Sequence, residues 1–418
     1  MPPGTVRLRF ENLEGIVLVP ATLHSTDHGD TSGPLALDTG AGFLALDFSL
    51  ARHLGLTDPL AADTASLAYA QRPLQRLELG TLEMDQVSPV LTLDATIVRR
   101  VTDRPVLGLL GQHVLQSYTL VVDYREQSIA LIPEEASASN DLPPDPMSRR
   151  AVSVPFRLAG DGKMLIEARV PGMMRRAQRT KRRVPVSDRD VPEMKQPEVA
   201  GIPATLTLIV DTGASKCVLF EESIVEWVPQ AGRWPSLRGL SAPTLVGASE
   251  ARLVRLPWLE LARSSRRLRL LGPDVVAMKS ELSGALSRGV GERVDGLLGY
   301  SFLKNYRFAI DYEHRVLWLD PLPRGWDGRR YEYSHVGVQL ERDGPAARVV
   351  AVAEGSPASA AGIEAGDEVI AIDGIASTRF DITTLSRRLE GPPGTRVNLR
   401  IRRGTVDRDY SLKRRRLL

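Results

Sequence analysis

The chain of 418 residues carries one short pattern twice, at matched spacing. Asp-Thr-Gly-Ala occurs at 38–41 and again at 211–214, each time behind an apolar run. Gly-Leu-Leu-Gly occurs at 108–111 and again at 296–299, and an Asp-Tyr pair begins twelve residues after the last glycine of each copy. Because the order and spacing of three elements recur together, we predict two similar halves, each containing a strand that ends in Asp-Thr-Gly.

The segments between these motifs are typical of strands. Short apolar runs rich in β-branched residues alternate with turn-forming residues, so the predicted fold class is mainly β. Tyr118–Tyr124 and Ile129–Ile132, for example, predict a hairpin. A stretch rich in Pro and Ser at 136–150 predicts a linker, after which the strand pattern restarts. A polar, basic insertion at 172–198 predicts a surface loop.

Composition is that of an ordinary globular protein, with 43% hydrophobic and 25% charged residues and a net charge of +3. The basic stretches lack interleaved aromatic residues, so no nucleic-acid partner is expected. No apolar run reaches the length of a membrane span. The start of the chain has no signal-peptide pattern, which predicts a cytoplasmic protein, or a periplasmic or secreted one if a leader has been removed.

The residues that could hold a metal ion are sparse. The six histidines show no metal-ligand spacing, so neither a metal nor a cofactor is expected. The single cysteine, Cys217, excludes an internal disulfide and is interpreted as a small buried hydrophobic residue.

The paired aspartates suggest acid–base chemistry. Two carboxylates held close together cannot both ionise, so they share a proton over a wide pH range. One can then act as base toward water while the other donates a proton to a carbonyl oxygen, which is hydrolysis of an amide without a covalent intermediate. The alternative is that both residues serve only as structural turns in an inactive pair.

Asp-Thr-Gly-Ala-Gly and Asp-Thr-Gly-Ala-Ser, each followed downstream by Leu-Leu-Gly, resemble the retropepsin-like aspartic proteases. The resemblance implies two retropepsin-like β-barrel halves, at 1–135 and 151–322, that form a pseudo-two-fold aspartic protease within one monomeric chain. It also implies roles for residues of both loops. These are catalysis by Asp38 and Asp211, bracing by the hydroxyls of Thr39 and Thr212, and close backbone approach at Gly40 and Gly213.

The same resemblance implies flaps that cover the substrate. Gly247 and Ala248 lie where the second half should have its flap, and Ala68 and Tyr69 are the equivalent in the first half. Gln112-His113 and Tyr300-Ser301 replace the polar or acidic residue that follows Leu-Leu-Gly in many members of the family, so the network that supports the two loops departs from the family's pattern.

After a second linker at 323–332, the motifs Gly-Ser-Pro-Ala, Ala-Gly-Ile, Gly-Asp and Ile-Asp-Gly resemble a small α/β PDZ domain at 333–418. In that family a loop, here Val336-Gly337, presents N–H groups to the terminal carboxylate of a peptide, and the strand from Val338 pairs with the peptide. Leu385 would line the side-chain pocket or simply belong to the core. Asp381 is a plausible N-cap for its helix.

The function predicted from the sequence is therefore an aspartic endopeptidase that acts on proteins or peptides and whose PDZ domain binds peptide C-termini or regulates access. The alternative is a catalytically inactive scaffold that binds peptides through the PDZ domain. A PDZ-bearing serine protease has little support, because no Ser/His/Asp arrangement with the expected local signatures occurs.

Overall fold

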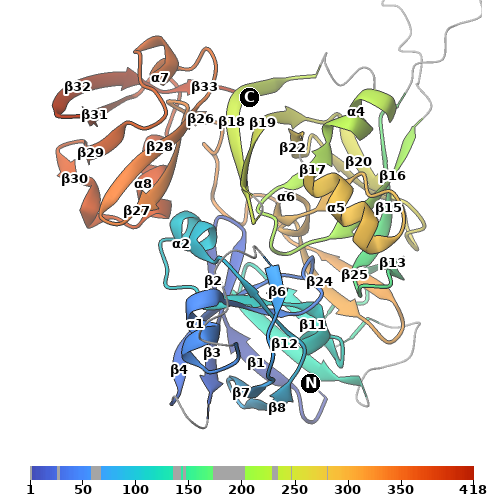
Figure 1. The fold of residues 1–418 in the computed structure, drawn as a ribbon. Helices are drawn as coiled ribbons and strands as arrows, with labels where there is room; N and C mark the ends of the chain where they lie inside the picture. The colour runs from blue at the N-terminus through green and yellow to red at the C-terminus, as the bar shows by residue number, and fades with distance from the viewer. Residues whose placement is uncertain are drawn as a thin grey trace, which may run out of the picture.

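The structure is a computed structural model. It describes residues 2–25, 29–57, 67–134, 143–144, 147–172, 203–227, 234–245, 247–279 and 281–418. The described residues are mainly β, as predicted, and pair into large sheets with short helices at their edges (Figure 1). All but the first residue of the predicted insertion at 172–198, and most of the predicted linker at 136–150, lie outside the described residues.

The first unit is a nine-stranded sheet with the order β6-β9-β5-β10-β4-β3-β7-β8, and β2 pairs with β3. Its strands are β2 (Glu11–Leu13), β3 (Ile16–His24), β4 (Thr31–Leu37), β5 (Leu44–Asp47), β6 (Leu67–Tyr69), β7 (Leu74–Leu79), β8 (Leu82–Val87), β9 (Val90–Leu93) and β10 (Gly108–Leu110). Its helices are α1 (Phe48–His53), α2 (Thr96–Thr102) and α3 (Gln112–Leu115).

The second unit is a ten-stranded sheet with the order β18-β19-β22-β17-β23-β16-β15-β20-β21, and β14 pairs with β15. Its strands are β14 (Arg157–Leu158), β15 (Met164–Val170), β16 (Ala204–Val210), β17 (Cys217–Phe220), β18 (Ser236–Thr244), β19 (Gly247–Arg255), β20 (Trp258–Leu261), β21 (Leu268–Leu271), β22 (Asp274–Met278) and β23 (Gly296–Leu298). Its helices are α4 (Glu221–Trp227), α5 (Glu281–Val290) and α6 (Tyr300–Leu303).

A six-stranded sheet joins the two units. Its order is β1-β12-β11-β24-β25-β13. The strands are β1 (Val6–Arg9), β11 (Tyr118–Asp123), β12 (Ser128–Pro133), β13 (Val152–Pro155), β24 (Tyr306–Asp311) and β25 (Val316–Pro321). Strands β11 and β12 form the predicted antiparallel hairpin. Strand β11 also pairs antiparallel with β24, with Val121 opposite Ala309, so the two strands that lead into the Asp-Tyr pairs meet at the centre of this sheet.

The sequence repeat corresponds to a repeated strand pairing. Strand β10 runs parallel to β4, with Leu110 opposite Leu37, and β23 runs parallel to β16, with Leu298 opposite Val210. These strands are apolar because they are buried on both faces. On one face Leu37, Leu110, Val210 and Leu298 belong to a core shared by both units, whereas the other face packs in a separate cluster in each unit. Each Asp-Thr-Gly therefore begins at the carboxyl end of a buried strand.

The C-terminal unit is a six-stranded sheet with the order β27-β28-β29-β31-β32, and β30 pairs with β29. Its elements are β27 (Val338–Asp343), β28 (Ala346–Val352), β29 (Glu368–Ile372), β30 (Ile375–Ala376), β31 (Arg396–Arg403), β32 (Val406–Lys413), α7 (Pro357–Ala360), the 3-10 helix η3 (Ser377–Arg379) and α8 (Ile382–Leu389). The short strands β26 (Ser334–His335) and β33 (Arg415–Arg416) pair beside it.

Helix α8 confirms the predicted N-cap, because the Asp381 carboxylate accepts from the Thr384 N–H at 2.7 Å. Its apolar residues face the unit's own hydrophobic core. In Figure 1 the unit projects to one side of the molecule, next to α2 and to the hairpin formed by β18 and β19.

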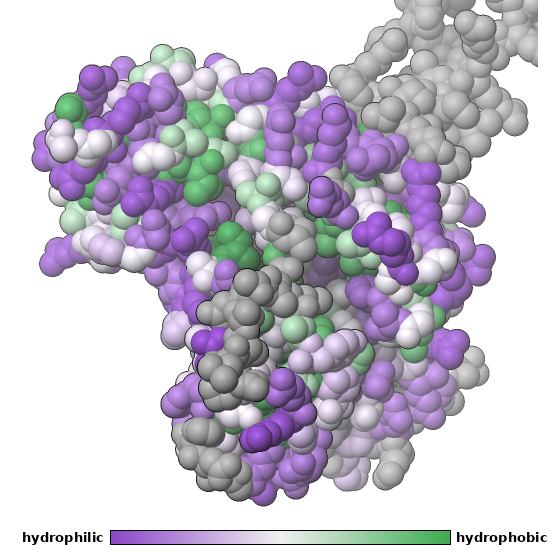
Figure 2. Space-filling view, in the orientation of Figure 1, coloured by the Kyte–Doolittle hydropathy of each residue, from purple (hydrophilic) through white to green (hydrophobic). Residues whose placement is uncertain are grey.

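The face of the molecule in Figure 2 is largely hydrophilic, with small separate apolar areas. Among the described residues, no helix is long and apolar enough to cross a membrane.

Candidate functional site

The two Asp-Thr-Gly loops meet and bind each other. The Thr39 N–H donates to Thr212 Oγ1 at 3.0 Å, and the Thr212 N–H donates to Thr39 Oγ1 at 3.1 Å. Each hydroxyl in turn donates to a carbonyl of the opposite strand, Thr39 to Val210 and Thr212 to Leu37, both at 2.9 Å. Both threonine side chains are fully buried, so each of these hydrogen bonds is protected from competing water.

This arrangement brings the two carboxyls together. The carboxyls of Asp38 and Asp211 lie close enough for each to act on the pKa of the other. The N–H groups of Gly40 and Ala41 donate to Asp38 Oδ1 at 2.8 and 3.0 Å. Their counterparts at 213 and 214 donate to Asp211 Oδ1 at 2.8 and 3.1 Å. The two loops therefore hold their carboxyls by the same contacts.

Glycine is required at the third position of both motifs. A Cβ at Gly40 would lie 2.7 Å from Asp211 Cγ, and a Cβ at Gly213 would lie 2.7 Å from Asp38 Cγ. Real Cβ atoms do not come this close to other heavy atoms. Each glycine thus lets its loop approach the carboxyl of the other loop.

Burial raises the pKa of both carboxyls. For Asp211 the negative charge of Asp38 adds to this effect and holds its pKa well above the ordinary value of 3.8. For Asp38 the pKa is also raised by burial, while the hydrogen bond from Gly40 and the charge of Lys163 act in the opposite direction. A carboxyl that keeps its proton beside one that loses its proton more readily is an acid–base pair.

Three of the residues that directly follow the two Leu-Leu-Gly motifs hydrogen-bond to the loops or to the strands after them. The Gln112 side chain is buried and donates to the carbonyl of Thr39. His113 Nδ1 accepts from the Leu44 N–H at 3.1 Å, and Ser301 Oγ accepts from the Cys217 N–H at 2.8 Å. Leu44 and Cys217 each lie six residues after their aspartate, so a histidine and a serine fill equivalent places in the two units.

Sequence reasoning missed Lys163. It lies in the turn between β14 and β15, which belongs to the second unit, yet its charge acts on Asp38 of the first unit. Its ammonium group pairs with Asp161, and the Asp161 carbonyl lies against Gly42. Only the contact between the two units shows what this turn lies against.

The four predicted flap residues lie on two strands. Gly247 and Ala248 are exposed and open β19, at the tip of the hairpin β18–β19. Figure 1 shows that this hairpin extends from the edge of its sheet toward the first unit. Ala68 and Tyr69 lie on β6, and the Tyr69 ring, 63% exposed, stands 6.0 Å from the ring of Phe43 near the first loop.

The predicted peptide-binding residues of the C-terminal unit are buried or already bonded. Val336 and Leu385 are fully buried, and Val338 is 6% exposed. Leu385 packs in the unit's core, which was the alternative reading of its role. The Gly337 N–H, expected to be presented to a peptide carboxylate, instead donates to His335 Nδ1 at 3.0 Å.

Cys217 is buried, as predicted, and burial raises the pKa of its thiol. In the part of the chain that the structure describes, no group of three or more His, Cys, Asp or Glu side chains could hold a metal ion.

Residues 348–403 match the PDZ domain family. The chain is 34% identical over 84 residues to the carboxyl-terminal-processing protease of Picosynechococcus sp., which is 20% of each protein. It is 37% identical over 84 residues to the chloroplastic carboxyl-terminal-processing peptidase 2 of Arabidopsis thaliana, 20% of this chain and 16% of that protein. The chain thus matches a fifth or less of the length of these relatives. A PDZ domain lies at its C-terminal end.

Two solved structures are also similar. The PDZ domain of the carboxy-terminal protease of Vibrio cholerae in complex with peptide is 16% identical, with a TM-score of 0.19 over 20% of this chain and 94% of that one. The aspartic proteinase of Irpex lacteus is 12% identical, with a TM-score of 0.41 over 76% of this chain and 97% of that one.

These relatives correct the predicted enzyme class. The two curated relatives described above are carboxyl-terminal processing proteases and not aspartic endopeptidases. The assignment of an aspartic-type endopeptidase, which depended on the Asp-Thr-Gly motifs, is wrong by this comparison. The predicted PDZ domain is confirmed.

Proposed function

We propose that this chain is a PDZ-containing protease that docks polypeptides by their C-terminal ends. The observation that carries the proposal is the 84-residue stretch shared at 34% and 37% identity with two processing proteases, together with the PDZ match. A PDZ domain takes up an extended peptide as an added strand, so the free edge of β27 is the expected docking line. Proteins or peptides with free C-termini are the proposed partners.

For the rest of the chain we propose a pair of retropepsin-like halves related by a pseudo-two-fold axis. The repeated pairing of β10 with β4 and of β23 with β16 supports this arrangement. The exchange of hydrogen bonds between Thr39 and Thr212 supports it as well.

We also propose Asp38 and Asp211 as the candidate catalytic residues, supported by Thr39, Gly40, Thr212 and Gly213. Their support is a pair of carboxyls of raised pKa that matching backbone hydrogen bonds hold at the place where the two units meet. The proposed flaps over that site contain Ala68, Tyr69, Gly247 and Ala248.

The test is digestion of a peptide library by the full chain, with products identified by mass spectrometry between pH 3 and 8. Asp38→Asn and Asp211→Asn keep the shape of each side chain and remove its acidity. A fluorophosphonate probe, which labels activated serine nucleophiles, is added in parallel.

Cleavage that is lost in both variants, without labelling, assigns the chemistry to the carboxyl pair. Cleavage that persists in both variants, with a labelled serine, would show that the carboxyl pair is not catalytic. The protease proposal would then still hold. Absence of any product under all conditions overturns the protease proposal, and peptide binding alone would then describe the chain.

A further inference from the structure

Strand β27 is the edge of the PDZ sheet where a docked peptide would pair. Among the strands that the structure describes, β27 pairs with β28 alone, so one row of its backbone groups faces away from the sheet. Helix α8 packs next to this strand. A peptide bound by β-augmentation would have to enter between them.

The first unit already covers this place. Helix α2 packs against both β27 and α8, and Asp103 ends α2 in the left-handed conformation with φ 55°. One carboxylate oxygen of Asp103 accepts from Arg342 Nε of β27 and from the Ile382 N–H of α8, both at 3.2 Å. A single side chain of the first unit therefore bridges the two elements between which a peptide must lie.

Two neighbouring ion pairs reinforce the cover. Arg100 of α2 lies 3.8 Å from Asp343 of β27, and Arg104 lies 3.6 Å from Asp381, the N-cap of α8. At the other end of the expected groove, the Gly337 N–H donates a hydrogen bond to His335 Nδ1. Residues of this chain therefore already make the contacts at both ends of the expected peptide groove.

The second unit holds the same strand through the hairpin β18–β19. Gln339 of β27 accepts from the Ser241 N–H at 2.7 Å and donates to the Ser241 carbonyl at 3.2 Å. The Glu354 N–H donates to the Arg238 carbonyl at 2.9 Å.

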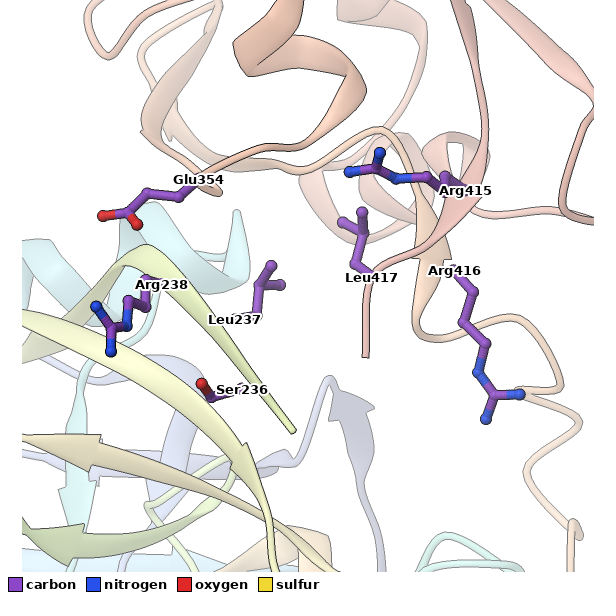
Figure 3. Close-up of a pocket in the computed structure, with 7 residues that line it drawn as sticks. All are labelled: Ser236, Leu237, Arg238, Glu354, Arg415, Arg416 and Leu417. Atoms are coloured by element: carbon purple, nitrogen blue, oxygen red, sulfur yellow. The ribbon is translucent and has the colours of Figure 1, made fainter. Parts of the chain in front are cut away.

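The base of this hairpin packs on the C-terminal end of the chain. Leu237, Leu253 and Ala353 form a small apolar cluster with Leu417 at its border. Figure 3 shows the pocket of about 270 Å³ beside it, where Leu237 from the hairpin and Leu417 from the C-terminal end line the same space.

We infer that the PDZ domain is held closed by the rest of the chain, with Asp103 as the residue that closes it. A peptide that pairs with β27 must displace α2 and Asp103, and the movement of β27 reaches Ser241 in the hairpin. Because linkage is reciprocal, whatever loosens the hairpin also favours peptide docking. This inference deepens the proposed function, since it concerns regulation of the proposed docking line.

The experiment is hydrogen–deuterium exchange on the full chain. Asp103→Gly removes the bridging carboxylate and suits the positive φ of this position, whereas Asp103→Asn keeps an acceptor and removes the charge. Asp85→Asn is the matched control, because Asp85 pairs with Arg76 at 2.8 Å within the hairpin of β7 and β8 in the first unit. Helix α8 keeps its own N-cap in every variant.

We expect amides of β27 and of 236–244 to exchange about tenfold faster in Asp103→Gly, less so in Asp103→Asn, and at the wild-type rate in Asp85→Asn. Equal exchange of β27 in the wild type and Asp103→Gly overturns the inference. Faster exchange in β27 with no change in the hairpin overturns the link to the second unit.

A binding measurement separates this inference from the proposed function. Ten-residue peptides with randomised C-termini and free carboxylates are captured by each variant, beside the same peptides with amidated ends. Greater capture of the free-carboxylate set by Asp103→Gly than by the wild type supports closure. Equal capture by both overturns closure while leaving the docking proposal intact. No capture by either variant contradicts peptide docking, and the exchange data then decide closure by themselves.

Discussion

Thr39 and Thr212 lie 173 residues apart in the chain and exchange hydrogen bonds across the junction of the two units. The N–H of each donates to the hydroxyl of the other, and each hydroxyl donates a hydrogen bond to a carbonyl of the opposite strand. No exposed surface remains on either side chain. The two carboxyl loops are therefore positioned by a buried polar network that joins the units, in addition to the apolar core they share.

Replacing Thr212 by Val should destabilise the protein by about 3 kcal/mol, because the substitution leaves the Thr39 N–H and the Leu37 carbonyl buried without partners. Thr212→Ser should recover most of this free energy of unfolding. Urea unfolding followed by fluorescence measures the difference. The matched control is Thr205→Val on the same strand, where the side chain is exposed. A cost below about 0.5 kcal/mol for Thr212→Val would contradict the role of the network.

Asp211→Asn should stabilise the fold at neutral pH. Burial and the charge of Asp38 raise the pKa of Asp211 in the folded protein, so folding favours the protonated carboxyl. The stabilisation of that protonated form is fully present below the ordinary pKa of 3.8 and is lost as pH rises through the raised value. Asparagine remains neutral, so its Tm should exceed that of the wild type by about 3 °C or more at pH 7–8 and converge with it near pH 3. A Tm difference that does not change with pH would argue against a raised pKa.

The charge of Lys163 lowers the pKa of Asp38, so removing it should raise that pKa further. The variant to use is Lys163→Met together with Asp161→Asn, because Asp161 would otherwise lose its ion-pair partner. Carbon-13 NMR of selectively labelled aspartate carboxyls follows the titration of the pair. Lys279→Met, at a lysine that is 80% exposed, is the control. An unchanged titration would mean that Lys163 does not act on the pair.

Glu332 connects the C-terminal unit to the second unit. Burial works to raise its pKa, but the charges of Lys216, Lys304 and Arg329 outweigh burial and lower the pKa to about 2. A lowered pKa means stability that is fully present above the ordinary value of 4.5 and lost as pH falls through about 2. Glu332→Gln should therefore cost on the order of 3 kcal/mol at pH 7.

The pH dependence of this cost is the sharper measurement. Thermal unfolding at several pH values should show the Tm difference between the wild type and Glu332→Gln shrinking below pH 4.5. Glu354→Gln, on the exposed side of the same junction, should change little. A Glu332→Gln variant as stable as the wild type at pH 7 would show that the cluster of charges does not hold the units together.

Much of the fold could be predicted from short sequence patterns. The hairpin of β11 and β12 and the cap of α8 at Asp381 were predictable, because alternation, turn residues and capping act over a few neighbouring positions. The PDZ domain was recognised from four short motifs and is supported by the family match. The protease class was not, because a motif that forms a loop does not by itself identify the reaction.

The contacts around the candidate site were harder to predict from the sequence. The spacing of Leu44 and Cys217 from their aspartates could have pointed to His113 and Ser301, since the repeat places these residues in the same frame. Nothing near Lys163 in the sequence indicates that its charge acts on Asp38. The Gly337 N–H, which the resemblance expects to face a peptide carboxylate, donates in this structure to His335, two residues earlier.

The sequence by itself determined two strands that end in Asp-Thr-Gly and a C-terminal unit with PDZ motifs, because apolar periodicity and glycine chemistry are properties of short segments. Only the tertiary structure decided that the two loops bind each other, that the charge of Lys163 acts on Asp38 and that Asp103 bridges β27 and α8. Those contacts join residues that lie far apart in the chain and depend on how whole sheets pack, so no local pattern encodes them.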